Sequence, residues 1–184
     1  MMMKQGIRIL ALNDSPFSLS DKATRIIGIV GRAGVIEGVL SFDVTVNGID
    51  STKKIISAIR KSRFAGQIKV LALNGTVIAG MNAIDIGEIR KRLGIEPIAI
   101  TRKRPRHGLL EAVAKRRLGA MRANMIRNLN SGLRILKIGN YYVQLPNLGS
   151  EKPSPELVEL CVSLLRLAHI VASGVARGES KGRL

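Results

Sequence analysis

The sequence predicts an α/β domain with a mixed sheet: a three-strand antiparallel meander, then alternating helices and parallel strands. Two segments rich in β-branched residues, 25–30 and 35–46, are joined by a short glycine-containing connection typical of a hairpin. A short apolar run at residues 7–12 precedes them. Further short apolar runs at 68–73 and 97–100 alternate with segments of helical periodicity, as expected for parallel strands with helical crossovers.

Helices are predicted where apolar residues recur on one helical face. After the capping residues Asp50, Ser51 and Thr52, three isoleucines at 55, 56 and 59 lie on one face of a helix that ends near Arg63. Further helices are predicted at residues 83–93, 109–128 and 155–176, and one or two strands at 134–144.

The predicted helix 155–176 is amphipathic. Glu159, Arg166 and His169 interrupt its apolar residues, so it falls short of the run of ~20 apolar residues that spans a membrane. We expect His169 to pack against neighbouring elements and Cys161 to lie in the core.

Chain-level features favour one domain in a reducing compartment. The 184 residues suffice for one core, so we expect a single domain over 1–184, with 177–184 as a flexible basic tail. One cysteine cannot form an internal disulfide, and the amino terminus lacks the features of a secretory signal. We therefore expect a cytoplasmic protein.

The charge balance indicates a polyanionic partner. The chain has 30 Lys and Arg against 13 Asp and Glu, a formal net charge of +17. Such an excess favours DNA or RNA as the partner. The alternative is a basic surface that serves solubility or meets an acidic protein in an assembly.

Polar residues follow two of the predicted strands. Asn13 and Asp14 end the first strand, and Asn74-Gly75 follows the strand at 68–73. If these strands are parallel neighbours, both pairs lie at one edge of the sheet. Ligands of open α/β sheets bind at such an edge, beyond the carboxyl ends of the strands. The sequence therefore predicts a site there.

The order of elements resembles the ribonuclease H-like fold, and separated motifs resemble one archaeal family. These motifs are Leu12-Asn13-Asp14-Ser15-Pro16-Phe17, Asn47-Gly48-Ile49-Asp50-Ser51-Thr52, Ser62-Arg63-Phe64 with Gln67, Leu73-Asn74-Gly75 with Ala79-Gly80-Met81-Asn82 and Asp85-Ile86, and residues 178–183. The family is domain of unknown function family 99, also called uncharacterised protein family 0215. It is distantly similar to endonuclease V.

This resemblance implies a metal site in which charges have been lost. Endonuclease V-like enzymes cut nucleic acid with a divalent metal, Mg²⁺ or Mn²⁺, held by three acidic residues. The matching positions are Asn13, Asp50 and Asn74, so two of the three are neutral. An amide oxygen can coordinate Mg²⁺ but brings no negative charge. We therefore expect an impaired or absent metal-nuclease centre.

Each acid near the site has more than one interpretation. Asp14 could replace Asn13 and hold a metal with Asp50, which would give an active endonuclease. Alternatively, Asp14 forms a turn and Asp50 caps the helix that begins at Ser51. Glu37, Asp43 and Asp85 are further acids that could supply a ligand.

Basic residues dominate the segment from Thr101 to Arg127. Nine cations stand there against the single acid Glu111. We predict that four of them bind the phosphate backbone with weak sequence discrimination: Arg102, Lys103, Arg104 and Arg106. The later cations, from Lys115 to Arg127, either join this surface or form a solvated helix face. His107 is a candidate for an exposed loop, and the sequence names no partner for it.

The leading hypothesis is a nucleic-acid-binding protein of endonuclease V-like fold with an impaired or absent nuclease centre. The alternatives are an active endonuclease that uses Mg²⁺ or Mn²⁺, and a non-catalytic assembly factor.

Overall fold

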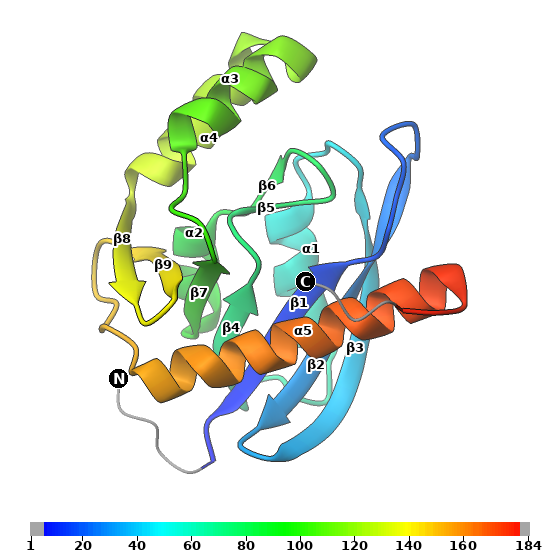
Figure 1. Ribbon diagram of the computed structural model, residues 1–184, viewed down its shortest axis with the longest axis vertical. Helices are drawn as coiled ribbons and strands as arrows, with labels where there is room; N and C mark the ends of the chain where they lie inside the picture. Colours follow the sequence, from blue (N-terminus) through cyan, green and yellow to red (C-terminus); the bar gives the residue numbers. More distant parts are fainter. Residues whose placement is uncertain (1–5, 181–184) are drawn as a thin grey trace.

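A seven-stranded mixed sheet forms the centre of the computed structural model, which describes residues 6–180 (Figure 1). The strand order is β3-β2-β1-β4-β7-β9-β8. The strands are β1 (Arg8–Asp14), β2 (Ala23–Arg32), β3 (Val35–Thr45), β4 (Ile68–Leu73), β7 (Glu96–Thr101), β8 (Leu133–Ile138) and β9 (Tyr141–Pro146). The first three strands are an antiparallel meander, and β4 and β7 run parallel to β1. The predicted topology is confirmed.

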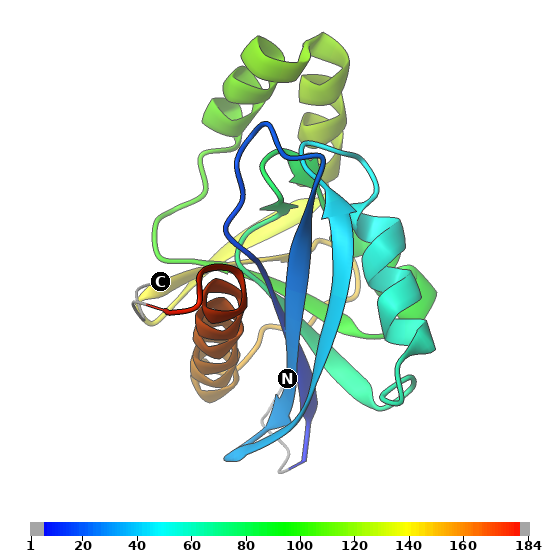
Figure 2. The ribbon, with the colours of Figure 1, turned by 90° about the vertical axis from the view of Figure 1, so that its right-hand side faces the viewer.

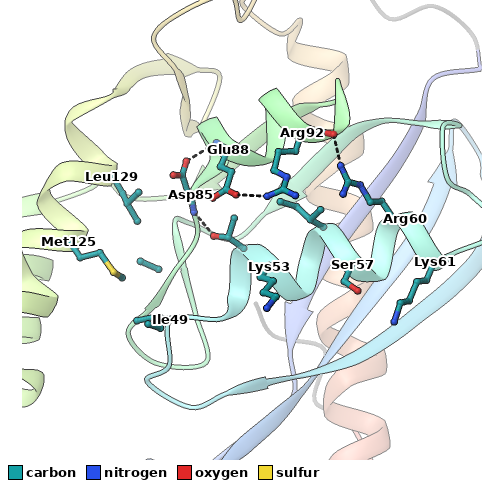
Figure 3. A pocket seen from close by; sticks show the side chains of 13 residues that line it. Ile49, Lys53, Ser57, Arg60, Lys61, Asp85, Glu88, Arg92, Met125 and Leu129 are labelled. Atoms are coloured by element: carbon teal, nitrogen blue, oxygen red, sulfur yellow. Dashed lines mark hydrogen bonds and ion pairs between the residues drawn. The ribbon is translucent and has the colours of Figure 1, made fainter.

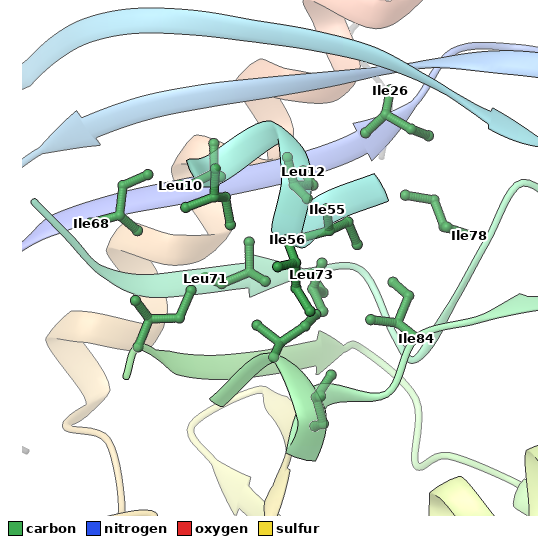
Figure 4. Packing of buried hydrophobic residues seen from close by; sticks show 14 of the residues in the cluster. Leu10, Leu12, Ile26, Ile55, Ile56, Ile68, Leu71, Leu73, Ile78 and Ile84 are labelled. Carbon is green, nitrogen blue, oxygen red and sulfur yellow. The ribbon is translucent and has the colours of Figure 1, made fainter. Parts of the chain in front are cut away.

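Helices cover both faces of the sheet (Figure 2). α1 (Ser51–Lys61) and α2 (Ile86–Leu93) cover one face, and α5 (Pro155–Arg177) covers the other. The isoleucines of α1 and the even-numbered Leu10 and Leu12 of β1 belong to one core (Figure 4). The odd-numbered Ile9 and Ala11 belong to the core under α5, because successive strand residues point to opposite faces.

α5 follows its predicted range closely. Ser154 caps its first turn by accepting a hydrogen bond from the Leu157 backbone N–H at 3.3 Å. The helix is long and apolar enough to cross a membrane by length and composition alone. Its apolar side instead packs on β1 and β2, with Cys161 in the core and His169 partly buried. Residues 181–184 of the predicted tail lie outside the described residues.

The prediction of one helix at residues 109–128 is wrong in one respect, because the region forms two helices. α3 (His107–Leu118) and α4 (Ala120–Ser131) meet at Gly119, whose φ of 89° and ψ of 172° are not helical. The two helices form an arm beyond the carboxyl end of β7 (Figure 1). A small cluster that includes Ala83, Ala114 and Ile126 joins the arm to the body.

The start of the second predicted helix is also corrected. Asn82 and Ala83 form the short strand β6 (Asn82–Ala83), which pairs with β5 (Val77–Ile78). α2 begins only at Ile86, because Asp85 caps it by accepting a 2.7 Å hydrogen bond from the Glu88 backbone N–H.

Candidate functional site at the strand tips

The carboxyl ends of β1 and β4 lie side by side. Leu12 and Leu73 are register partners in the parallel pair, so Asn13 and Asn74 follow at the same edge of the sheet. These two residues, Asp14 and others line a small cavity of about 30 Å³. A cavity of this size holds about one water molecule. The sequence prediction that these residues lie close together is thus confirmed.

Strand alternation assigns the amides and the carboxylate to different faces. Residues two apart in a strand point to the same face of the sheet. Asn13 comes two residues after Ala11, and Asn74 two residues after Ala72; both alanines belong to the core under α5. Asp14 comes two residues after Leu12, which belongs to the core under α1 and α2. The two asparagines therefore lie on the α5 side of the strand tips, and Asp14 lies on the opposite side.

Asn13 is buried, with 5% of its surface exposed. Its Oδ1 accepts a hydrogen bond from the Asp14 backbone N–H at 3.0 Å, whereas its Nδ2 has no hydrogen-bond partner among the described residues. An unpaired buried polar group costs about 1–3 kcal/mol. The unpaired group of Asn13 is its Nδ2, a hydrogen-bond donor, and an NH₂ group does not coordinate a cation.

Asp14 stabilises an unusual backbone conformation. Its Oδ2 accepts a hydrogen bond at 2.8 Å from the backbone N–H of Ala79. Ala79 is fully buried and has a φ of 49°, a left-handed conformation that is uncommon for residues other than glycine. The Asp14 carboxylate thus connects the tip of β1 to the β5–β6 turn.

The loops at residues 45–50 and 79–82 are joined by hydrogen bonds, and we call this pair the loop clamp. The Asn47 backbone N–H donates to the Ala79 carbonyl at 2.8 Å, and the Met81 backbone N–H donates to Asn47 Oδ1 at 3.0 Å. Gly80 has a φ of 83°, and a side chain there would collide with Asn47 Oδ1.

Asp50 lies at the centre of the loop clamp. Its Oδ1 accepts from Asn82 Nδ2 at 2.7 Å, and its Oδ2 accepts from Thr45 Oγ1 at 2.8 Å. The Thr45 backbone N–H also donates to Oδ1, at 3.2 Å. Burial alone would raise the pKa of Asp50, but the hydrogen bonds from Asn82 and Thr45 outweigh it and lower that pKa below its usual value. Its side chain makes no capping hydrogen bond to α1.

The remaining acids are engaged elsewhere. Glu37 forms ion pairs with Arg8 and Arg32, Asp43 pairs with Arg25, and Asp85 caps α2. Over residues 6–180, no group of three or more His, Cys, Asp or Glu residues could hold a metal ion. The donors at the strand tips therefore do not fit a metal site built from three carboxylates, because Asn13 and Asn74 bring no charge and Asp14 and Asp50 accept hydrogen bonds from the protein.

The cations of the basic segment between β7 and α3 are exposed to solvent. Arg102, Lys103, Arg104 and Arg106 are all exposed, and none forms an ion pair with an acid in the described part of the chain. Arg102 and Lys103 line a cavity of about 320 Å³ together with Asn74. This part of the basic segment thus lies next to the strand tips.

The cations of the arm divide into two groups. Lys115, Arg116 and Arg117 are exposed on α3. Arg127 pairs with Glu111 at 2.8 Å, and Arg122 Nη1 donates to the carbonyl oxygens of the loop clamp, at 2.6 Å to that of Gly48. Arg122 therefore attaches the arm to the loop clamp.

One prediction in the basic segment is wrong. His107 is the first residue of α3, and its Nε2 lies 2.7 Å from Gln144 Oε1. Gln144 is a buried residue of β9, so His107 is partly buried at the start of α3 and not in an exposed loop.

A larger groove of about 590 Å³ lies between α1, α2 and α4 (Figure 3). Met125 and Leu129 lie near Ile49 at its apolar end. At the charged end, Arg60 donates to the Arg92 carbonyl at 3.1 Å. Asp85, one of the further acids considered as a metal ligand, lines this groove, whereas Asn13, Asp14, Asp50, Asn74 and the four cations at 102–106 do not.

The sequence matches a known protein family over nearly its whole length. The model of the family described as Endonuclease dU matches residues 5–176, which is nearly the whole sequence. The chain belongs to the Endonuclease dU family.

Relatives in this family are archaeal proteins of the uncharacterised family 0215, as the sequence motifs predict. The chain is 33% identical to a UPF0215 protein of Methanothermobacter thermautotrophicus, over 98% of this chain and 93% of that protein. It is 31% identical to a UPF0215 protein of Pyrococcus furiosus, over 97% of this chain and 96% of that protein.

Solved structures agree with the Endonuclease dU assignment at the level of the fold. An Archaeoglobus fulgidus protein of unknown function matches with a TM-score of 0.75 and 27% identity, over 92% of this chain and 98% of that one. Human ENDOV matches with a TM-score of 0.51 and 13% identity, over 90% and 82%. The predicted ribonuclease H-like, endonuclease V-like fold is confirmed.

Three residues that organise this Endonuclease dU family member were not predicted as site residues. Asn82 joins Asp50 to the first turn of α1, Arg122 attaches the arm, and Tyr141 lines the cavity beside Asn74. Asn82 belongs to a motif that carries the family resemblance, and this motif was the one signal that pointed to it. Neither Arg122 nor Tyr141 stands in a pattern that distinguishes it from its neighbours.

Proposed function

We propose that this protein binds nucleic acid through the phosphate backbone at Arg102, Lys103, Arg104 and Arg106, and that its strand-tip site lacks an efficient metal-nuclease centre. One contrast carries the proposal: the four cations are exposed and free of ion pairs with described acids, whereas Asp14 and Asp50 accept hydrogen bonds from the protein. Free cations at an edge of the sheet can neutralise phosphates and release counterions. The family description, Endonuclease dU, favours DNA that contains deoxyuridine as the ligand.

A salt titration tests the binding surface. Alanine at all four positions is expected to weaken binding to duplex and single-stranded DNA. It should also flatten the slope of log K against log salt by about 0.9 for each duplex phosphate that the protein no longer neutralises. A matched control removes four exposed cations elsewhere: Lys61, Lys69, Lys91 and Arg92. Binding that is absent, or independent of salt in the wild type, would instead favour an assembly protein with an acidic protein partner.

A second experiment tests the metal-nuclease centre. We expect the wild type to show little cleavage of deoxyuridine-containing DNA with Mg²⁺ or Mn²⁺, because Asn13 and Asn74 carry no charge and Asp14 accepts a hydrogen bond from Ala79. Replacing Asn13 and Asn74 together by Asp would restore two charges at this edge. A gain of metal-dependent cleavage would identify a degenerate nuclease site, and efficient cleavage by the wild type would contradict the proposal.

A further inference from the structure

The groove between α1, α2 and α4 has two chemically different ends (Figure 3). Its apolar end adjoins the first turn of α1 and is lined by Ile49, Met125 and Leu129. Its charged end, at Arg60 and Lys61, lies roughly 12 Å further along α1, which is about two helical turns. The groove therefore suits a ligand with an apolar group at one end and a charged group at the other.

The apolar end is exposed to solvent. Ile49 has 67% of its surface exposed, although Met125 and Leu129 of α4 lie near it. Water on a large apolar side chain is unfavourable, and an apolar group of a partner would displace it. Methionine also adapts its shape to what it contacts, because its side chain is unbranched and flexible.

The charge of the groove favours an acidic ligand. Four cations line it against two acids, and both acids are already engaged: Asp85 caps α2, and Glu88 forms an ion pair with Arg92. Arg60 donates a hydrogen bond to the Arg92 carbonyl and retains further N–H donors for a carboxylate. Three exposed cations of the groove form no ion pair with an acid among residues 6–180: Lys53, Arg60 and Lys61.

We propose that this groove binds an acidic, amphipathic helix of a partner protein. An apolar side chain of the partner packs against Ile49 and Met125, and carboxylates about two helical turns away meet Arg60 and Lys61. Amphipathic helices bind apolar grooves in this way, through side chains spaced along one face. None of the cations proposed to bind phosphate lines the groove, so the inference does not depend on nucleic-acid binding.

The lining favours a protein over nucleic acid as the occupant. Among the described residues, no aromatic side chain lines the groove, so unpaired bases would find no surface for stacking. Phosphates would meet cations at the charged end but would leave the aliphatic side chains of the other end uncovered. A protein helix supplies an aliphatic side chain and carboxylates together.

Fluorescence anisotropy with short labelled peptides tests the proposal. Two helical peptides each carry two leucines one turn apart and three glutamates about two turns away, after the leucines in one peptide and before them in the other. This covers both directions in which a helix can lie in the groove. We expect one of them to bind the wild type, and matched peptides with glutamine for glutamate, or serine for leucine, to bind roughly tenfold more weakly. If neither acidic peptide binds, the proposal is overturned.

Two pairs of variants locate the peptide in the groove. Met125→Gln makes the apolar end polar at nearly constant size, and Lys61→Glu reverses a charge, so each should weaken binding roughly fivefold. The controls should retain the wild-type affinity: Met121→Gln at an 86% exposed position of the same helix, and Lys91→Glu in the last turn of α2, as Lys61 is in that of α1. Equal losses in groove and control variants would show attraction by net charge alone and would overturn the proposal. Circular dichroism verifies that each variant is folded, and the surface change Lys61→Glu keeps the test decisive if Met125→Gln unfolds.

DNA binding and NMR separate this surface from the nucleic-acid surface. Lys61→Glu should bind DNA as well as Lys91→Glu does; if it alone loses DNA and peptide affinity together, the groove belongs to the nucleic-acid surface and the proposal fails. The methyl signal of Met125 should shift when the acidic peptide is added, whereas that of Met121 should not. An unchanged Met125 signal at a saturating peptide concentration would also overturn the proposal, whatever the outcome of the DNA titrations.

Discussion

The two asparagines at the strand tips differ from Asp14 beside them and Asp50 in the loop clamp in how their polar groups are satisfied. Asn13 has an Nδ2 without a partner among residues 6–180, and Asn74 is exposed beside the 320 Å³ cavity. Asp14 accepts a hydrogen bond from Ala79, and Asp50 accepts hydrogen bonds from Thr45 and Asn82. The amides are on the α5 side of the sheet, and the carboxylates bind the loops on the other side.

This difference separates ligand binding from structural support. Asp50 already uses most of the about four acceptor sites of a carboxylate on Thr45 and Asn82, and each hydrogen bond to a charged group contributes about 1.5–3 kcal/mol. Asp14 uses one such site on Ala79. The exposed amide of Asn74 lies beside a cavity instead. We infer that the carboxylates stabilise the fold and that Asn74 is free to bind a ligand.

The largest expected effect comes from removing Asp50. Asp50→Ala leaves Asn82 Nδ2 and the Thr45 N–H and hydroxyl without this acceptor, so we expect the free energy of unfolding to fall by about 3 kcal/mol. Urea denaturation followed by circular dichroism measures this. Asp43→Ala is the control, because Asp43 makes an exposed ion pair with Arg25 and should cost less than about 1 kcal/mol. Equal losses in both variants would show that the loop clamp contributes no special stability.

A smaller effect is expected at the tip of β1, where adjacent residues allow a direct comparison. Asp14→Ala removes the acceptor for the left-handed Ala79, and we expect a loss of about 1–2 kcal/mol. Asn13→Ala removes a buried amide whose Nδ2 is unpaired among the described residues, so its cost should stay below about 1 kcal/mol. The same denaturation experiment measures both, and the reverse order would contradict the structural role of Asp14.

The arrangement of the strand tips could be predicted from the sequence because it depends on local signals. Short apolar runs end in Asn13-Asp14 and Asn74-Gly75, and the right-handed crossover rule makes their strands parallel neighbours. Four exposed cations after β7 were likewise evident as a local cluster.

The roles of the aspartates could not be predicted, because their partners are distant in the sequence. Asp14 bonds Ala79, 65 residues away, and Asp50 bonds Asn82, 32 residues away. Which carboxylate is satisfied therefore depends on how the loops pack. The arm shows a similar limit: Gly119 separates two helices, although apolar periodicity alone favours one continuous helix.

The smallest expected effect is a dependence of stability on pH that tests the same carboxylate. The hydrogen bonds of Asp50 hold its pKa in the folded state below its usual value, despite burial. Such a group stabilises the fold above the pKa of the unfolded state, which is about 3.9, and this contribution is lost as pH falls through the lower folded-state pKa. Asp50→Asn lacks a titrating group, so its free energy of unfolding should fall less between pH 7 and pH 3 than that of the wild type. The difference is modest because the side chain is 26% exposed and solvent screens the charge. Parallel pH profiles of the two proteins would show that the carboxylate makes no net electrostatic contribution to the loop clamp.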